Sequence, residues 1–233
     1  MKKEEDILQE NMLAIFDIDG TICDTQDVEG RCYLRAFEET FGIRLATTDW
    51  TTFEEPTSSG IVRSLCAGCE DVEEKEIAFR DRFVALLEKE RPDFPGDFCP
   101  LAGATEFIEL LLADPTVTVA FATGGFDTEA AFKLRCCGIE LGNFPHATSS
   151  DTPSRRDIIP LAASRAGTAL TSAVYFGDAP WDNEVCRALG IPMIGIGRRI
   201  ESLRKLGLED VFRDFTEPQA IRNTMQNRAA RGE

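Results

Sequence analysis

The sequence predicts an α/β fold, a doubly wound parallel sheet that carries an inserted helical segment. Short, continuously apolar runs are typical of strands buried on both faces, and amphipathic helical patterns lie between them. Residues 25–99 break this alternation, because they show helical patterns without strong strand signals. With 233 residues, 43% of them hydrophobic, the chain can bury the core of one large domain with a smaller insertion.

Four apolar runs predict the strands, at residues 12–16, 117–122, 173–176 and 191–196. The first delivers Asp17, the second stops at Thr123-Gly124-Gly125, and the third stops at Gly177-Asp178. Doubly wound sheets bind ligands at the carboxyl ends of their strands. We therefore expect Asp17, Thr123 and Asp178 to converge on one site.

Helical patterns divide the chain into a core and an insertion. The predicted helices are residues 28–41, 58–67, 72–90, 105–113 and 158–166. The first three belong to the insertion, so we expect a Rossmann-like core from residues 1–24 and 100–233 and a helical subdomain from residues 25–99. The polar residues 222–233 are expected to form a frayed tail.

Charge restricts the classes of partner. The chain has 41 acidic residues against 25 Lys and Arg, a net charge of −16, so its field repels nucleic acid and anionic membrane surfaces. We expect neither as a partner. An anionic substrate then needs a local positive site, which a metal or a few placed basic side chains would provide.

Compartment and thiol chemistry are also predicted. The first eleven residues lack the apolar segment of a secretion signal, and no apolar run approaches the roughly 20 residues needed to span a bilayer. We expect a cytoplasmic protein whose eight cysteines are reduced. Cys66 and Cys69 have the spacing of a redox dithiol or half a zinc site, but no second half accompanies them. A thiol redox protein is an alternative that thiol titration would test.

The segment FDIDGT, residues 16–21, is the strongest chemical signal. Two carboxylates two residues apart can point into one crevice when the chain turns at Gly20. One carboxylate, with its charge offset by a divalent cation, can attack phosphorus, and the other can hold the proton that the leaving oxygen needs. An acidic turn that only ends a strand is the competing interpretation.

Two further segments suit phosphate and metal. In FATGG, residues 121–125, the Thr123 hydroxyl and the backbone N–H groups of the glycine turn, Gly124 included, can bind phosphoryl oxygens. In YFGDAPWDNE, residues 175–184, Asp178 and Asp182 follow a predicted strand. With Asp17 they would be an adequate set of oxygen ligands for Mg²⁺. A basic residue must offset these carboxylates, and Arg155 and Arg156 are the candidates, with Arg155 the first choice.

The order FDIDGT, FATGG, basic residue and GDAPWD resembles the four motifs of the haloacid dehalogenase-like hydrolase superfamily across the whole chain. The resemblance implies a Rossmann-like core with a helical cap over the site. It also implies that Asp17 is the nucleophile that forms an aspartyl-phosphate, that Asp19 is the general acid/base and that Thr123 binds phosphate. Asp178 and Asp182 become the metal-side carboxylates, and the backbone carbonyl of Asp19 a magnesium ligand.

One departure concerns the basic residue, which in the family is commonly a lysine in a KP-containing segment. Here two arginines follow Pro153, and the choice between Arg155 and Arg156 stays open. Lys133 follows the second motif too closely to fit that role.

The resemblance narrows the function to phosphoryl transfer, because dehalogenases of this family lack the second aspartate, here Asp19. We expect a Mg²⁺-dependent phosphatase acting on a small phosphorylated metabolite. The alternatives are a phosphomutase of the sugar-phosphate type and a catalytically silent binding protein, which would be expected to lack one of the motif carboxylates. Arg31, Arg35 and Arg63 of the predicted insertion are candidates to contact the substrate.

Overall fold

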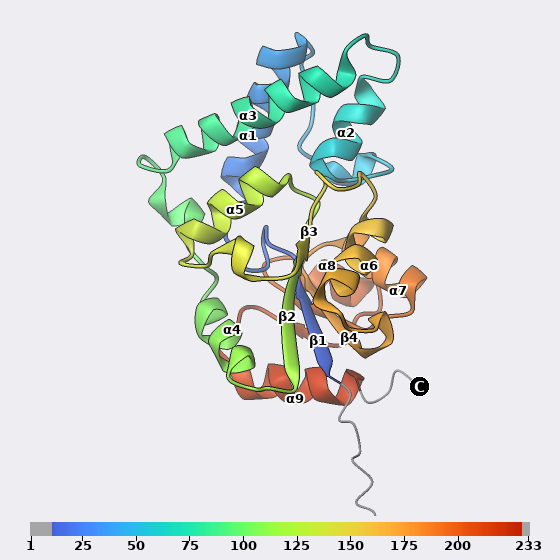
Figure 1. Cartoon of the computed structure of the whole chain (residues 1–233). Helices are drawn as coiled ribbons and strands as arrows, with labels where there is room; N and C mark the ends of the chain where they lie inside the picture. The colour runs from blue at the N-terminus through green and yellow to red at the C-terminus, as the bar shows by residue number, and fades with distance from the viewer. Residues whose placement is uncertain (1–10, 230–233) are drawn as a thin grey trace, which may run out of the picture.

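A computed structural model describes residues 11–229 and contains a six-stranded parallel sheet (Figure 1). The strands are β1 (Met12–Phe16), β2 (Val117–Ala122), β3 (His146–Ala147), β4 (Ala173–Gly177), β5 (Met193–Ile196) and β6 (Val211–Phe212). Their order is β3-β2-β1-β4-β5-β6, which confirms the predicted α/β fold. Phe16 of β1 is level with Phe121 of β2 and Phe176 of β4, so residues that follow these three strands share one edge.

Helices cover both faces of the sheet. Successive side chains of a strand point to opposite faces, so neighbouring residues of one strand pack against different helices. Ala14 and Phe16 of β1 pack in one cluster with α4, α5 and α9, whereas Leu13 and Ile15 pack in another with α6, α7 and α8. The covering helices are α4 (Ala104–Leu112), α5 (Asp127–Cys136), α6 (Arg155–Ala166), α7 (Pro180–Leu189), α8 (Ile200–Lys205) and α9 (Pro218–Ala229). Burial on both faces explains why the strands are continuously apolar.

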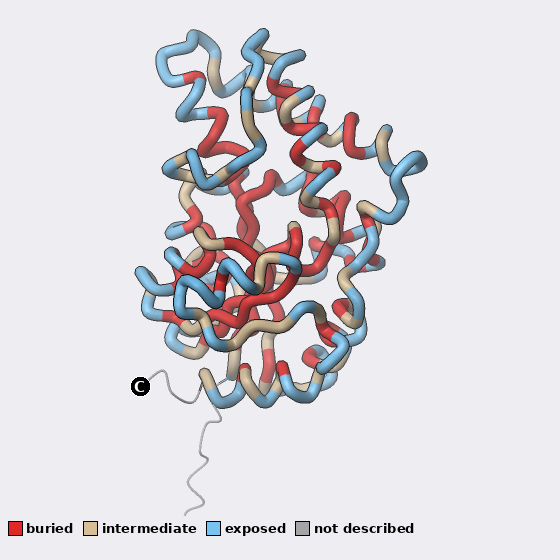
Figure 2. Tube along the Cα trace, turned by 180° about the vertical axis from the view of Figure 1, so that it is seen from behind, coloured by how far each residue is buried: buried red, intermediate tan, exposed pale blue. Residues whose placement is uncertain are grey.

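The segment between β1 and β2 folds as α1 (Gln26–Phe41), α2 (Ser58–Leu65) and α3 (Val72–Glu90). Figure 1 shows these helices together beyond the carboxyl edge of the sheet. They have an aromatic core of their own, in which Tyr33 of α1 contacts Phe79 of α3 edge to face with ring centroids 4.9 Å apart. Phe126 and Phe132, at and within α5, join this cluster, and Figure 2 shows buried residues in the sheet and in the inserted helices alike.

Hydrogen bonds fasten the inserted segment to the loops at the edge of the sheet. The backbone N–H of Ser58 donates to the carbonyl of Gly124 at 2.7 Å, and the Thr57 hydroxyl donates to the carbonyl of Pro153 at 2.6 Å. Within the segment, the Tyr33 hydroxyl donates to the carbonyl of Ser58 at 3.0 Å. The start of α2 therefore lies directly against the loop that follows β2.

Several elements differ from the sequence prediction. β5 begins at Met193 instead of residue 191, because the N–H of Ile191 bonds back to Cys186 at the end of α7 and Pro192 has no N–H to donate. The expected tail is wrong for residues 222–229, which belong to α9 because Ile221 and Met225, one helical turn apart, are buried against the sheet. Residues 1–10 and 230–233, which the prediction assigned to the core, lie outside the described residues.

All eight cysteines are free, and Cys66 is buried whereas Cys69 is exposed. No helix within residues 11–229 is both long and apolar enough to cross a membrane.

Candidate active site

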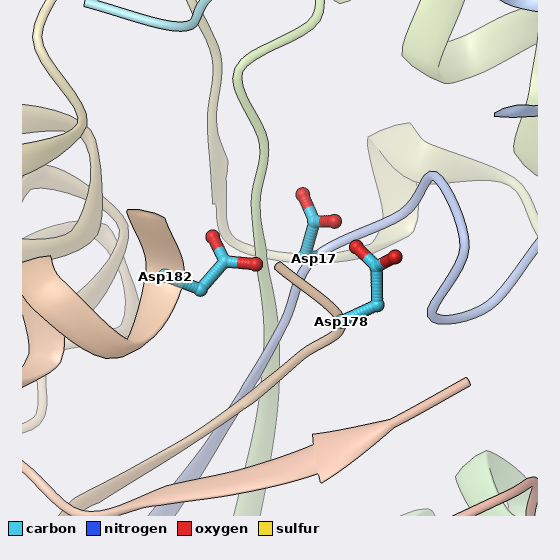
Figure 3. Close-up of side chains that lie close together, drawn as sticks. All are labelled: Asp17, Asp178 and Asp182. Carbon is cyan, nitrogen blue, oxygen red and sulfur yellow. The ribbon is translucent and has the colours of Figure 1, made fainter. Parts of the chain in front are cut away.

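Three carboxylates converge at the carboxyl edge of the sheet (Figure 3). Asp17 follows β1, Asp178 follows β4, and Asp182 lies in the first turn of α7. One oxygen from each lies within 4.8 Å of the others, and all three residues are buried. The structure thus brings together residues that are far apart in the sequence, as the positions of the strand ends predicted.

Electrostatics at this cluster favour a bound cation. Burial raises the pKa of Asp17 well above its usual range, Arg155 opposes this effect, and Asp182, Asp178 and Asp19 add to it. Burial also raises the pKa of Asp178 to about 7, against the opposing charge of Arg199. The raised pKa values mean that the clustered carboxyl groups are costly to ionise unless more positive charge is nearby. Hard divalent cations bind carboxylate oxygens, so these residues fit a divalent metal.

Arg155 is the cation nearest the nucleophile candidate. It begins α6, and its guanidinium Nη1 lies 3.4 Å from Asp17 Oδ1 and 2.9 Å from Asp182 Oδ1. Asp182 also accepts hydrogen bonds from the Tyr175 hydroxyl at 3.3 Å and from the Ala179 N–H at 3.1 Å. Its oxygens are therefore engaged by protein donors, and Asp182 holds Arg155 in place. Arg156, the alternative, is exposed.

The turn after β1 depends on Gly20. Its φ is +80°, and a Cβ there would lie 2.0 Å from Gln26 Nε2 and 2.6 Å from Asp178 Oδ2. A side chain at this position would therefore displace the groups that surround Asp178. Gln26 donates to Asp178, and the Thr25 hydroxyl donates to Asp19, so the first residues of the inserted segment contact both acids.

The other predicted phosphate ligands border the same cavity as Asp17 and Asp19. This cavity has a volume of about 160 Å³ and includes Thr123, Gly124 and Arg155 in its wall. A Cβ on Gly124 would lie 2.7 Å from Arg155 Nη2, so glycine lets the loop after β2 approach the guanidinium. Asp182 is absent from the wall, consistent with its place behind Arg155.

The inserted segment supplies the opposite wall, with side chains that the sequence reasoning did not select. Arg31 pairs with Asp97, Arg35 with Glu39, and Arg63 with Glu76, and none of these arginines borders the cavity. The helices that carry these arginines turn other faces to the cavity, so the structure gives no support to the expectation that they contact the substrate. The residues of the segment in the wall are Gln26, Asp27, Glu29, Tyr33, Thr48, Trp50, Pro56, Thr57, Ser58 and Ile61.

Arg199 and Trp181 form part of the wall on the core side. The Arg199 guanidinium carbon lies 5.6 Å from the centroid of the Trp181 indole, and Nη1 lies 3.6 Å from Asp178 Oδ2. Arg199 was not selected from the sequence. Its position just past the strand that ends at Ile196 could have indicated it, by the same reasoning that selected Asp17.

A second buried cation is Lys133 of α5, which on sequence grounds was set aside as the basic residue of the phosphate site and given no other role. Its Nζ lies 2.7 Å from Asp19 Oδ1, 3.1 Å from Glu29 Oε1 and 3.5 Å from Glu129 Oε1, and its side chain is 0% exposed. Burial alone would lower the pKa of Lys133, but the three carboxylates outweigh that effect and raise it well above its usual value. Burial raises the pKa of Glu29 and of Glu129, and Lys133 opposes both shifts. Lys133 therefore stays charged inside the protein.

The family model for haloacid dehalogenase-like hydrolases matches residues 14–196. The match spans the first strand, the inserted segment and the residues after β4, and the chain belongs to this family. This match confirms the resemblance that the four motifs indicated, and the protein is a hydrolase of this family.

Solved structures share the fold at low sequence identity. A hydrolase from Pseudomonas syringae superposes with a TM-score of 0.71 at 22% identity, covering 93% of this chain and 98% of its own. CbbY from Rhodobacter sphaeroides, solved with phosphate, has a TM-score of 0.69 at 18% identity, covering 88% and 95%. A predicted phosphoglycolate phosphatase from Haemophilus somnus 129pt has a TM-score of 0.62 at 16% identity, covering 93% and 99%. No curated protein matches the chain.

Proposed function

We propose that this protein is a magnesium-dependent phosphatase that hydrolyses a small organic phosphate monoester through an aspartyl-phosphate on Asp17. The observation that carries the proposal is the meeting of Asp17, Asp178 and Arg155 at one cavity, a nucleophile beside a cation-binding carboxylate and an anion-binding guanidinium. Membership of the hydrolase family supports it, as do fold neighbours described as a phosphatase and as bound to phosphate.

In the first step a carboxylate oxygen of Asp17 bonds to phosphorus. The bond between phosphorus and the leaving oxygen breaks, its electron pair stays on that oxygen, and the oxygen takes a proton from the Asp19 carboxyl group. Arg155, 3.4 Å away, offsets part of the cost of burying the charge of Asp17, and a bound cation would supply the rest of the positive charge that keeps Asp17 ionised for this attack.

In the second step water replaces the enzyme at phosphorus. The water gives a proton to the Asp19 carboxylate, its oxygen bonds to phosphorus, and the bond between phosphorus and the Asp17 oxygen breaks. Inorganic phosphate leaves, and both aspartates return to their starting protonation states. A phosphomutase would differ only here, because a second substrate hydroxyl would take the place of water.

The remaining site residues bind the phosphoryl group and the metal. The Thr123 hydroxyl, the Gly124 N–H and the Arg155 guanidinium bind phosphoryl oxygens. Asp17, Asp178 and the backbone carbonyl of Asp19 would hold Mg²⁺. Asp182, expected from the motif to be a ligand as well, would add its negative charge from behind Arg155, because its oxygens already accept hydrogen bonds from protein donors. When bound there, Mg²⁺ would supply positive charge that stabilises the phosphoryl oxygens.

Residues 25–99 act as the cap in this proposal and residues 1–24 and 100–233 as the core, with the outermost residues beyond the described range. The cap wall contains Asp27 and Glu29, hydroxyl groups and two aromatic side chains, and no Lys or Arg of described cap residues borders the cavity. Such a wall suits a neutral or cationic leaving group, because its described residues offer no basic side chain to receive a second anionic group.

The test is release of phosphate from p-nitrophenyl phosphate and from a panel of sugar, nucleotide and amino-alcohol phosphates, each with Mg²⁺ and with chelator. We expect turnover that requires Mg²⁺, with monophosphates of neutral or cationic alcohols ahead of bisphosphates and phosphorylated acids. Isomerised sugar phosphate without net phosphate release would replace the phosphatase with the mutase. Binding of the panel without any turnover would leave a silent binding protein.

A further inference from the structure

Lys133 has no part in the chemistry proposed above, although it is the only fully buried lysine among residues 11–229. It lies on α5 of the core, one helical turn after Glu129. Glu29, its second partner, lies on α1 of the cap, and Asp19, its third, lies in the loop after β1. One ammonium group thus joins α5 to the loop after β1 and to α1, both of which lie far from α5 in the sequence.

The ammonium group fills an acidic cluster that would otherwise suit a metal. Oxygens of Asp19, Glu29 and Glu129 lie within 4.8 Å of one another, and Lys133 Nζ lies within 3.5 Å of one oxygen of each. An ammonium has three N–H donors and no acceptor, which matches three carboxylates. The cation of this second cluster is therefore built into the chain.

The contacts to Asp19 define which of its oxygens can exchange a proton. Lys133 Nζ approaches Oδ1 at 2.7 Å, and the Thr25 hydroxyl donates to the same oxygen. With Oδ1 engaged by two donors, Oδ2 is the oxygen presented for proton transfer. Lys133 contacts Asp19 from behind the cavity wall, because Lys133 is fully buried and does not border the cavity.

We propose that Lys133 is a positioning residue that orients Asp19 for proton transfer to the leaving oxygen, and that Glu29 completes this arrangement when the cap helix α1 lies against the core. The inference rests on the proposed phosphatase function. A positioning role gives a reason for burying a lysine among three acids beside the site. Stability alone does not require this arrangement, because a buried ion pair need not stabilise a protein more than an exposed one.

The test compares leaving groups. p-Nitrophenolate departs with little help from an acid, whereas an alkoxide must be protonated, so only alkyl phosphates depend strongly on a well-placed Asp19. The parameter is kcat/KM, which covers events up to the first irreversible step, departure of the leaving group. We expect Lys133→Met to lower kcat/KM for an alkyl phosphate on the order of 10²-fold and for p-nitrophenyl phosphate by less than about five-fold.

Two further variants keep the test decisive. Glu29→Gln, at a partly exposed position, should fold even if Lys133→Met does not. It should also lower kcat/KM more for the alkyl phosphate than for p-nitrophenyl phosphate, but with a smaller difference between the two substrates than in Lys133→Met. Lys75→Met, at an exposed position of α3, is the matched control and should change neither. Thermal unfolding of each variant identifies any loss that follows from unfolding.

Equal losses on the two substrates in folded Lys133→Met and Glu29→Gln, or no loss on either, would overturn the positioning role while leaving the phosphatase function intact. A wild-type protein that hydrolyses neither substrate with Mg²⁺ is a different result, because it overturns the proposed function itself.

Discussion

Two buried cations flank the candidate active site, and their surroundings differ in one respect. Arg155 contacts Asp17, Asp182 and Tyr175, all of which belong to the core. Lys133 contacts Asp19 and Glu129 of the core but also Glu29 of α1. We refer to these sets as the Arg155 cluster and the Lys133 cluster.

In the proposed mechanism, this difference separates binding of the phosphoryl group from departure of the leaving group. The Arg155 cluster is complete without the inserted segment, so the proposed phosphoryl side would be preorganised by the sheet edge and by α6 and α7. The Lys133 cluster is complete only with α1 against the core. Planar, permanently charged arginine suits an oxyanion, and the compact ammonium suits the meeting point of three carboxylates.

The largest expected effect is loss of the nucleophile. Asp17→Asn should lower kcat/KM by at least ~10⁴-fold for every substrate, because its amide cannot form the acyl phosphate. Asp19→Asn should instead cost more with alkyl phosphates than with p-nitrophenyl phosphate, because it removes the acid. Steady-state rates on both substrates measure this contrast. A leaving-group dependence in Asp17→Asn would contradict the division of roles.

The next effect concerns the two neighbouring arginines. Arg155→Met should reduce kcat/KM by ~10²- to 10³-fold with either leaving group, because it removes the oxyanion partner and leaves Asp17 and Asp182 buried without it. Arg156→Met, next in sequence but exposed, is the matched control and should be close to wild type. The reverse ranking would remove Arg155 from the phosphate site.

Metal binding should distinguish the clusters by stability. Mg²⁺ at one hundred times its dissociation constant should raise the free energy of unfolding by about 2.7 kcal/mol. Asp178→Asn should abolish most of this increase, whereas Glu29→Gln should preserve it, because the Lys133 cluster already holds a cation. Thermal melts of each variant with Mg²⁺ and with chelator measure the stabilisation by the metal. The opposite pattern would place the metal in the Lys133 cluster and contradict the proposal.

The smallest expected effect is on stability, and it comes from an ion pair between Arg165 of α6 and Asp151 in the loop before that helix. Arg165 donates to both carboxylate oxygens of Asp151, at 3.0 and 2.7 Å. Burial pushes the pKa of Asp151 upward, but the hydrogen bonds from Arg165 and from the Thr148 N–H outweigh it and lower that pKa. A lowered pKa in the folded state adds stability above the unfolded pKa, and this stability is lost as pH falls through the folded value.

Arg165→Met should therefore reduce the free energy of unfolding by about 1 kcal/mol at neutral pH, a modest value because the pair is partly exposed. The difference from wild type should shrink below about pH 4, where Asp151 is protonated in the unfolded chain. Chemical denaturation across this pH range measures it. A difference that is constant with pH would assign the effect to packing instead.

The fold was largely predictable because burial on both faces makes parallel strands continuously apolar. The two edge strands β3 and β6 were missed, since two residues carry no periodic signal. The buried face of α9 was missed because its neighbours are polar and only Ile221 and Met225 reach the core. Such short or sparse elements are determined by tertiary contacts.

The site was predictable where residues follow strands and unpredictable where helices approach from outside. Asp17, Thr123 and Asp178 were chosen by their positions after strands, and Arg155 by its helix start. Glu129 and Lys133 have the i,i+4 spacing of an ordinary exposed ion pair, and only the position of α5 beneath the inserted segment shows that both are buried.

The most direct test of the central claim is detection of the phosphorylated carboxylate. Asp19→Asn protein, slowed in activating water, would be mixed with p-nitrophenyl phosphate and Mg²⁺, quenched in acid and digested for mass spectrometry. We predict a phosphoryl group on Asp17 that hydroxylamine removes and that is absent from the Asp17→Asn, Asp19→Asn double variant. Unmodified Asp17 throughout turnover, or undiminished hydrolysis by Asp17→Asn, would contradict the account.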